Sequence, residues 1–114
     1  MNMINRSALV VEPAQPFMDW LHRVDPTSAQ LTLEDLRQEP TIYLLPEWET
    51  QEEALQHLTD VSSEIFEEQL NDWYRVPSVW PEDRELNAFL CWFDCSFHSM
   101  VVDICDERLR HTDL

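Results

Sequence analysis

The chain has 114 residues, of which 23 are aspartate or glutamate and seven are arginine, and it contains neither lysine nor glycine. Its formal charge of −16 disfavours contact with nucleic-acid backbones and anionic membranes. The lack of glycine excludes the phosphate-binding loops of P-loop and Rossmann proteins. Apolar residues still make up 44% of the chain and include five tryptophans, so it has enough core-forming side chains to fold, unlike a disordered acidic segment.

The first third of the chain has one strand signal and two helix signals. Residues 7–12 (SALVVE) form a short apolar run that Pro13 ends, which predicts a buried strand. A helix is expected over residues 16–24, because a proline fits its first turn and apolar residues recur at helical spacing. Thr32 precedes a turn with two acidic residues at positions 34 and 35, which predicts the N-cap of a short second helix that the next proline ends.

The rest of the chain repeats the pattern of a strand followed by helices. Residues 41–45 (TIYLL), flanked by two prolines, predict a second strand. Thr50 is the expected N-cap of the longest helix, which runs to about residue 74. A further helix is expected over residues 81–93 and a last strand over residues 96–104.

This order, β-αα-β-α-α-β, places helices between all the strands. Tight two-residue hairpins of the Asn-Gly kind are not available to a chain without glycine. The pattern therefore predicts an α+β fold, a two-layer domain in which helices pack on one face of a three-stranded sheet. Strand directions are left open by the pattern. We expect residues 1–114 to form one domain with a frayed tail at residues 106–114.

Four seven-residue segments give a resemblance to known sequences. Residues 7–13 (SALVVEP), 15–21 (QPFMDWL), 41–47 (TIYLLPE) and 98–104 (HSMVVDI) resemble small acidic bacterial proteins that are uncharacterised. These segments cover less than a third of the chain. The resemblance implies a bacterial, cytosolic protein and supplies no catalytic residues.

The cysteines and the N-terminus bear on the compartment. Cys91, Cys95 and Cys105 are an odd number of thiols, so they cannot all pair within one chain. The apolar run at residues 8–11 is too short for the hydrophobic region of a signal peptide. No stretch approaches the roughly 18 apolar residues of a membrane span. These features predict a cytoplasmic location with reduced thiols.

An acidic stripe is the most regular pattern in the long helix. Asp60, Glu64, Glu68 and Asp72 recur every fourth residue with Glu67 beside them, so successive carboxylates lie about 6 Å apart along the axis. This spacing is similar to that of phosphates along a DNA strand. The stripe is either a binding surface for a cationic partner or a solvated outer face of the helix.

Cysteine and histidine residues near the C-terminus raise the question of a metal site. Cys91, Cys95, His98 and Cys105 follow a C-x3-C-x2-H-x6-C pattern, and thiolates and imidazoles bind zinc. The pattern departs from a zinc knuckle, and the expected strand places His98 on an inward face opposite the two later cysteines. Packing of the cysteines as small apolar residues is the alternative. Clustered carboxylates could also hold Ca²⁺ or Mg²⁺.

An enzyme is the third class considered. Glu53 and His57 are four residues apart on one helix, where a carboxylate could raise the proton affinity of an imidazole for acid–base chemistry. Asp94 is a candidate third residue. No nucleophile or oxyanion donor lies near them in sequence, and ordinary pairing on a helix surface explains the spacing equally well.

Two tryptophans lie in loops next to proline. Trp48 and Trp80 are candidate apolar anchors for a partner if they are exposed, and lids on the core if they fold back. A homodimer could form through Phe97 and Val101 if helices cover only the opposite face of the sheet.

Taken together, the sequence predicts a non-enzymatic interaction protein without a cofactor. Its partner would be a basic protein, contacted by Asp60, Glu64, Glu67, Glu68 and Asp72 with Trp48 or Trp80 as anchors. A nucleic-acid mimic and an antitoxin-like or immunity-like inhibitor are two forms of this function. A metal-binding protein or a small enzyme is the alternative.

Overall fold

The structure is a computed structural model that describes residues 1–114. Five strands, four α-helices and two short 3-10 helices follow one another along the chain. In order they are β1 (Asn2–Met3), β2 (Ser7–Pro13), α1 (Gln15–Val24), η1 (Pro26–Ser28), α2 (Leu33–Leu36), β3 (Thr41–Leu45), α3 (Gln51–Trp73), η2 (Pro77–Val79), α4 (Leu86–Trp92), β4 (Phe93–His98) and β5 (Val102–Asp103). None of the helices is both long enough and apolar enough to span a bilayer.

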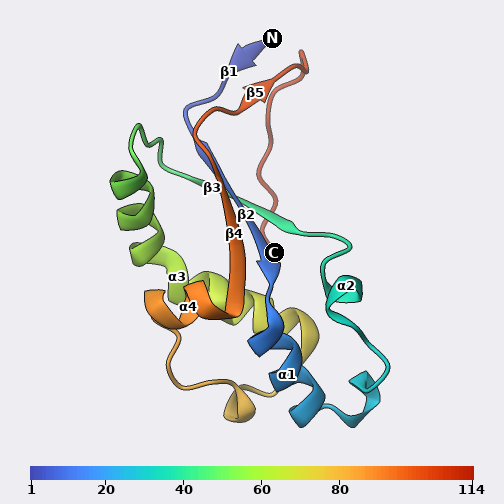
Figure 1. The fold of residues 1–114 in the computed structure, drawn as a ribbon. Coiled ribbons are helices and arrows are strands. Elements are labelled where there is room, and N and C mark those ends of the chain that lie inside the picture. The colour runs from blue at the N-terminus through green and yellow to red at the C-terminus, as the bar shows by residue number, and fades with distance from the viewer.

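The main sheet has three antiparallel strands in the order β3-β2-β4 (Figure 1). In the central strand, Leu9 pairs with Tyr43 on one side and with Phe97 on the other. Both neighbours of β2 are reached through helices, in agreement with the absence of glycine hairpins. The α+β prediction, a three-stranded sheet with helices on one face, is confirmed, and the strand directions that the sequence left open are antiparallel.

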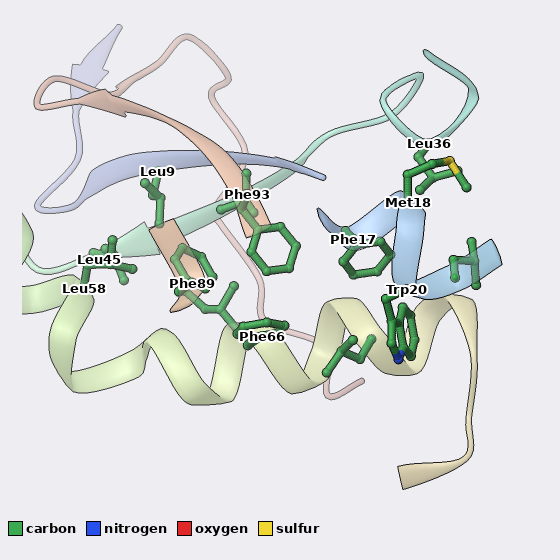
Figure 2. Packing of buried hydrophobic residues seen from close by; sticks show 14 of the residues in the cluster. Leu9, Phe17, Met18, Trp20, Leu36, Leu45, Leu58, Phe66, Phe89 and Phe93 are labelled. Carbon is green, nitrogen blue, oxygen red and sulfur yellow. The ribbon is translucent and has the colours of Figure 1, made fainter. Parts of the chain in front are cut away.

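The core lies between this sheet and helices α1, α3 and α4 (Figure 2). Phe66 of α3 is fully buried, and its ring lies 5.1 Å from that of Phe93 and 6.1 Å from that of Phe89. Phe17 of α1 closes the same aromatic cluster, with its ring 5.5 Å from Phe93. Alternate residues of β2, such as Leu9, add to this layer and are fully buried. Large apolar area removed from water is the main stabilising contribution to such a core.

The end of the chain differs from the sequence-based expectation. The helix expected over residues 81–93 begins only at Leu86, and the last strand begins at Phe93 and ends at His98. The reason is the length of β2, which offers pairing partners for β4 as far back as Pro13, opposite Phe93. The predicted strand over residues 96–104 was therefore wrong in its limits.

A second, two-residue ladder accounts for the rest of that predicted strand. After β4 the chain turns, and Val102 of β5 pairs with Met3 of β1, away from the main sheet (Figure 1). The side chains of β4 also face the opposite way from the sequence-based expectation. Phe93, Cys95 and Phe97 point into the core layer, whereas His98 is exposed, so the prediction of an inward His98 was wrong. Residues 106–114 form no helix or strand and are exposed.

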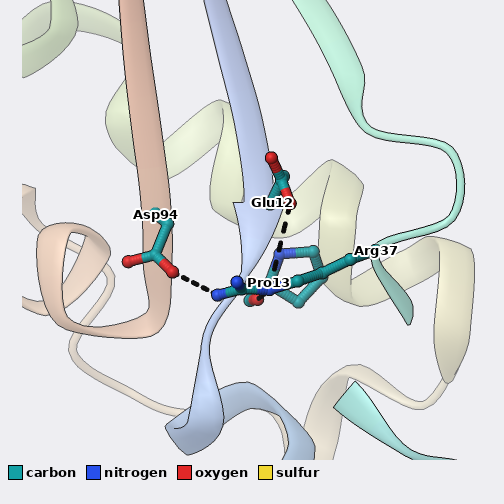
Figure 3. Close-up of polar contacts among 4 residues, drawn as sticks. All are labelled: Glu12, Pro13, Arg37 and Asp94. Atoms are coloured by element: carbon teal, nitrogen blue, oxygen red, sulfur yellow. Dashed lines mark hydrogen bonds and ion pairs between the residues drawn. The ribbon is translucent and has the colours of Figure 1, made fainter. Parts of the chain in front are cut away.

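Arg37 ties three elements together at the end of the sheet (Figure 3). It directly follows α2, and its Nε donates a 2.7 Å hydrogen bond to the carbonyl oxygen of Pro13 in β2. Its guanidinium also pairs with Asp94 of β4, and Glu12 lies 3.9 Å away. A guanidinium presents several donors in a fixed plane, which suits it to bridge such separate acceptors.

Candidate functional site

A groove of about 220 Å³ runs between strand β3 and helix α3. Its lining is mostly apolar, and its two charged residues are the carboxylates Glu64 and Glu68 of α3. The lining residues are Tyr43, Leu44, Leu45, Val61, Glu64, Ile65 and Glu68. The groove therefore combines an apolar floor with an acidic rim, and it contains two residues of the predicted acidic stripe.

A partly buried hydrogen-bond network connects strand β3 on one side of the groove to helix α3 on the other. The hydroxyl of Tyr43 donates to Oε1 of Glu68 at 2.7 Å. The amide Nε2 of Gln69, a residue only 4% exposed, donates to the Tyr43 hydroxyl at 2.8 Å and to Oγ1 of Thr41 at 3.0 Å. Because buried polar groups need partners, these bonds hold β3 at one position along α3.

The tyrosine in this network is a hydrogen-bond donor and not an anion. Burial raises the pKa of the Tyr43 phenol well above its usual range. The hydrogen bond from Gln69 opposes this rise, while the bond to Glu68 and its negative charge add to it. The neutral phenol can therefore donate to Glu68 throughout the physiological pH range, and Glu68 is held in place at the rim.

The acidic stripe does not behave as one uniform surface. Each four-residue step turns by about 40° around the helix axis, so the stripe winds gradually around α3. Asp60 and Glu64 are exposed and form no hydrogen bond or ion pair within the chain, whereas Glu68 is half-buried against Tyr43. Glu67 points to another neighbour, with Oε2 3.7 Å from Nε of Arg84. The structure thus separates Glu67 from the groove.

Asp72 is the last residue of the stripe, and the negative charge of Glu68 affects its carboxyl group. Partial burial raises the pKa of the Asp72 carboxyl, the Glu68 carboxylate raises it further, and Arg75 opposes the change. Like charges four residues apart on a helix are unfavourable by a few tenths of a kcal/mol. Asp72 and Glu68 therefore concentrate negative potential beside the groove at a small cost in stability.

The strand that borders the groove is an edge of the main sheet. All backbone hydrogen bonds of β3 to another strand go to β2, and its other edge has no backbone partner. On its outer face, Ile42 is 63% and Leu44 is 44% exposed. The segment 41–45 carries no charge, although charged side chains are a common protection of edge strands. An unpaired apolar edge thus lies directly beside the groove.

Neither predicted loop tryptophan is an exposed anchor. Trp48 is 6% exposed, and its ring lies 5.8 Å from that of Phe97 in an edge-to-face arrangement. Trp80 is half-buried, and its Nε1 donates to the carbonyl oxygen of Tyr74 at 2.8 Å. Both rings fold back on the core, which was the alternative interpretation. Phe97 faces the helices as well, so the expected dimer surface of Phe97 and Val101 does not exist as one strand face.

The cysteines and His98 do not form a metal site. Cys91 is exposed on α4, Cys95 packs against the core from β4, and Cys105 is exposed after β5. His98 lies on the sheet face opposite Cys95. No three His, Cys, Asp or Glu side chains anywhere in the chain come together as a group that could hold a metal ion. The zinc and calcium interpretations thus have no geometric support.

Glu53, His57 and Asp94, the three residues of the enzyme interpretation, each contact a different partner and not one another. The carboxylate of Glu53 accepts a hydrogen bond from the backbone N–H of Glu49, and a ring nitrogen of His57 lies 3.3 Å from the carbonyl oxygen of Glu47. Asp94 pairs with Arg37 at the end of the sheet. The expected acid–base pairing of Glu53 with His57 is therefore not formed.

One serine–histidine pair was not found from the sequence. Oγ of Ser96 lies 2.7 Å from Nε2 of His98 on the outer face of β4. Both residues are exposed, no pocket surrounds them, and the other ring nitrogen of His98 has no partner to orient it. A catalytic pair needs such a third group and a place for the substrate. The alternation of a strand, which places residues i and i+2 on one face, was the available signal.

Comparison with known proteins gives no further guide to the site. No protein-family model matches the chain, and neither a curated protein nor a solved structure has significant similarity to it.

Proposed function

We propose that this protein is a non-enzymatic interaction module that binds a basic protein partner at the groove between β3 and α3. One observation carries the proposal. The groove has an apolar floor, formed in part by Val61 and Ile65, and its charged rim residues are the carboxylates Glu64 and Glu68. Arginine and lysine fit such a site, because their aliphatic stems pack on apolar surface while their charged ends reach carboxylates.

The charge of the whole chain supports the same kind of partner. A formal charge of −16 attracts basic proteins over a distance and repels acidic ones. Asp60 and Glu64 have no partner within the chain, so they are free to pair with one. Three unpaired cysteines, two of them exposed, fit a bacterial protein that works in the reducing cytoplasm.

The geometry supports a groove more than a continuous mimic of nucleic acid. A phosphate-like row needs evenly spaced free charges, but Glu67 pairs with Arg84 and Glu68 accepts a bond from Tyr43. An inhibitor of a basic protein remains within the proposal, because it needs only the groove and the surrounding negative potential. The identity of the partner distinguishes a nucleic-acid mimic from an inhibitor of another basic protein.

Affinity capture from a lysate of the source organism tests the proposal. The bait is the full chain, compared with a Glu64→Lys variant and with a Glu82→Lys variant. Glu82 is exposed and outside the groove, so the two variants change the net charge equally. We expect a basic protein on the wild-type and Glu82→Lys baits that is lost from Glu64→Lys and weakened by salt. Equal capture by all three baits contradicts the proposal.

A further inference from the structure

We propose that the partner binds as an extended segment that adds a fourth strand to the free edge of β3, with basic side chains on the groove side. This inference rests on the proposed function and specifies the conformation of the bound segment. It follows from the open edge of β3, the groove beneath that edge and the position of the rim carboxylates.

The backbone of β3 supplies the first part of the recognition. Its outward N–H and C=O groups have no backbone partner in the chain, since the sheet continues only toward β2. Strand addition to such an edge is a recurrent mode of peptide recognition, in which main-chain hydrogen bonds provide affinity. Pro40 and Pro46 flank the five residues of β3, so the added strand would pair over a short length only.

The two faces of β3 define which side chains the added strand should carry. Tyr43 and Leu45 face α3, and an added side chain beside them would enter the groove near Glu64. Ile42 and Leu44 alternate with them and are exposed, and Leu44 also borders the groove. Because side chains alternate along a strand, the segment should alternate basic residues toward the groove with apolar residues toward Ile42 and Leu44.

Charge favours a basic segment over a second copy of the same chain as the strand that pairs with β3. An exposed apolar edge strand without charges can also pair with its own copy. Two such copies would place both Glu64 and Glu68 rims close together, and each copy has a formal charge of −16. Like charges at close approach oppose that pairing, whereas a basic strand gains from the same carboxylates.

Synthetic peptides test strand addition without knowledge of the natural partner. The probe is a blocked seven-residue peptide in which arginine and valine alternate, and two derivatives are N-methylated either at every arginine or at every valine. Successive residues of a strand direct their N–H groups to opposite edges, so one derivative blocks the edge that faces β3 and the other blocks the solvent edge. We expect one derivative to bind about tenfold or more weakly and the other to bind as the parent does.

Amide hydrogen exchange of the full-length protein, measured by NMR, locates the contact. We expect slower exchange of β3 amides when the parent peptide is added to wild-type protein and to Glu82→Lys, but not when it is added to Glu64→Lys. Peptide binding that depends on Glu64 without protection of β3, or with equal loss from both N-methylated derivatives, overturns strand addition but leaves the proposed function intact. No binding of the parent peptide overturns strand addition as well.

A second measurement in the same samples identifies the competing occupant. If β3 amides become protected without peptide as the protein concentration rises, a second copy occupies the edge, and the inference is wrong. A different result contradicts the proposed function, namely equal capture of basic proteins by the wild-type and Glu64→Lys baits. The two proposals can therefore fail separately.

Discussion

Tyr43 and Glu68 join the edge strand to the acidic helix through a 2.7 Å hydrogen bond from the phenol to the carboxylate. The bond links residues 25 positions apart and fixes one end of the groove. The carboxylate of Glu68, which belongs to the acidic stripe, therefore has a hydrogen-bond partner within the chain. Glu64, one helical turn earlier, is exposed and makes no hydrogen bond or ion pair within the chain.

Removal of the Tyr43 hydroxyl should weaken the fold moderately. A Tyr43→Phe substitution deletes the bond to Glu68 and one of the two bonds made by the amide of Gln69. We expect the free energy of unfolding to fall by about 1–3 kcal/mol, because one acceptor is charged and both groups are partly buried. Urea denaturation measures the change. Tyr74→Phe is the control, since the hydroxyl of Tyr74 makes no hydrogen bond within the chain, and an equal loss in both variants contradicts the interpretation of the network.

Glu64→Lys should stabilise the protein while it removes binding. Lysine at this position replaces two like-charge pairs, with Asp60 and Glu68, by two opposite-charge pairs at the same helical spacing. We expect the free energy of unfolding to rise by about 0.5–1 kcal/mol, measured by urea denaturation at low ionic strength. A gain in stability together with a loss of affinity is the pattern of a residue retained for function. A destabilised variant would mean that Glu64 has a structural role.

The thiol of Cys95 should be the least reactive of the three, and it should reduce stability at alkaline pH. Burial, with a smaller effect of Asp94, raises the pKa of Cys95 from 9.0 to about 11. Between these values the unfolded chain loses the thiol proton and the folded chain keeps it, so stability should fall as the pH rises from about 9 to 11.

Two measurements check the prediction for Cys95. Under native conditions at pH 8, an alkylating reagent should modify the exposed Cys91 and Cys105 first, because the thiolate is the reactive form. Urea denaturation of Cys95→Ala, in a reducing buffer, should show a smaller loss of stability at alkaline pH than the wild type. Part of the loss will remain, because the pKa of Tyr43 is raised too. Equal alkylation rates for all three thiols would contradict the structure.

Trp48 should affect stability and not partner recognition. Trp48 is 6% exposed and its ring packs against Phe97, so Trp48→Ala should leave a cavity and lower the free energy of unfolding by about 3–5 kcal/mol. A Trp48→Phe variant keeps most of the volume and should lose less stability. Thermal denaturation measures both variants. If Trp48→Phe is stable but no longer captures the basic partner, the tryptophan is an anchor after all.

The local sequence was sufficient to predict most of the architecture. The strand TIYLL was predicted with its observed limits because Pro40 and Pro46 mark both ends. Thr50 accepts a hydrogen bond from the backbone N–H of Glu53, as an N-cap should, and α3 ends within a residue of its predicted end. Signals of this kind depend only on residues that are close in sequence, so they can be recognised in one sequence without the fold.

The features that failed depend on partners distant in sequence. Phe93 fits the apolar spacing of a helix, but pairing with Pro13 draws it into β4. The burial of Trp48 could not be read from its loop, since it depends on Phe97, almost fifty residues later. The groove was missed for the same reason: the sequence showed Glu64 and Glu68 as parts of a stripe but not the edge strand beside them.

The most direct test of the central claim is the dissociation constant of the alternating arginine–valine peptide, measured by calorimetry at low and moderate ionic strength. Wild type, Glu64→Lys and Glu82→Lys are compared in the same buffers. The groove interpretation predicts that wild type and Glu82→Lys bind similarly, that both weaken with salt, and that Glu64→Lys binds at least about tenfold more weakly. Equal affinities for the two variants would contradict it, because the peptide would then respond to net charge and not to the groove.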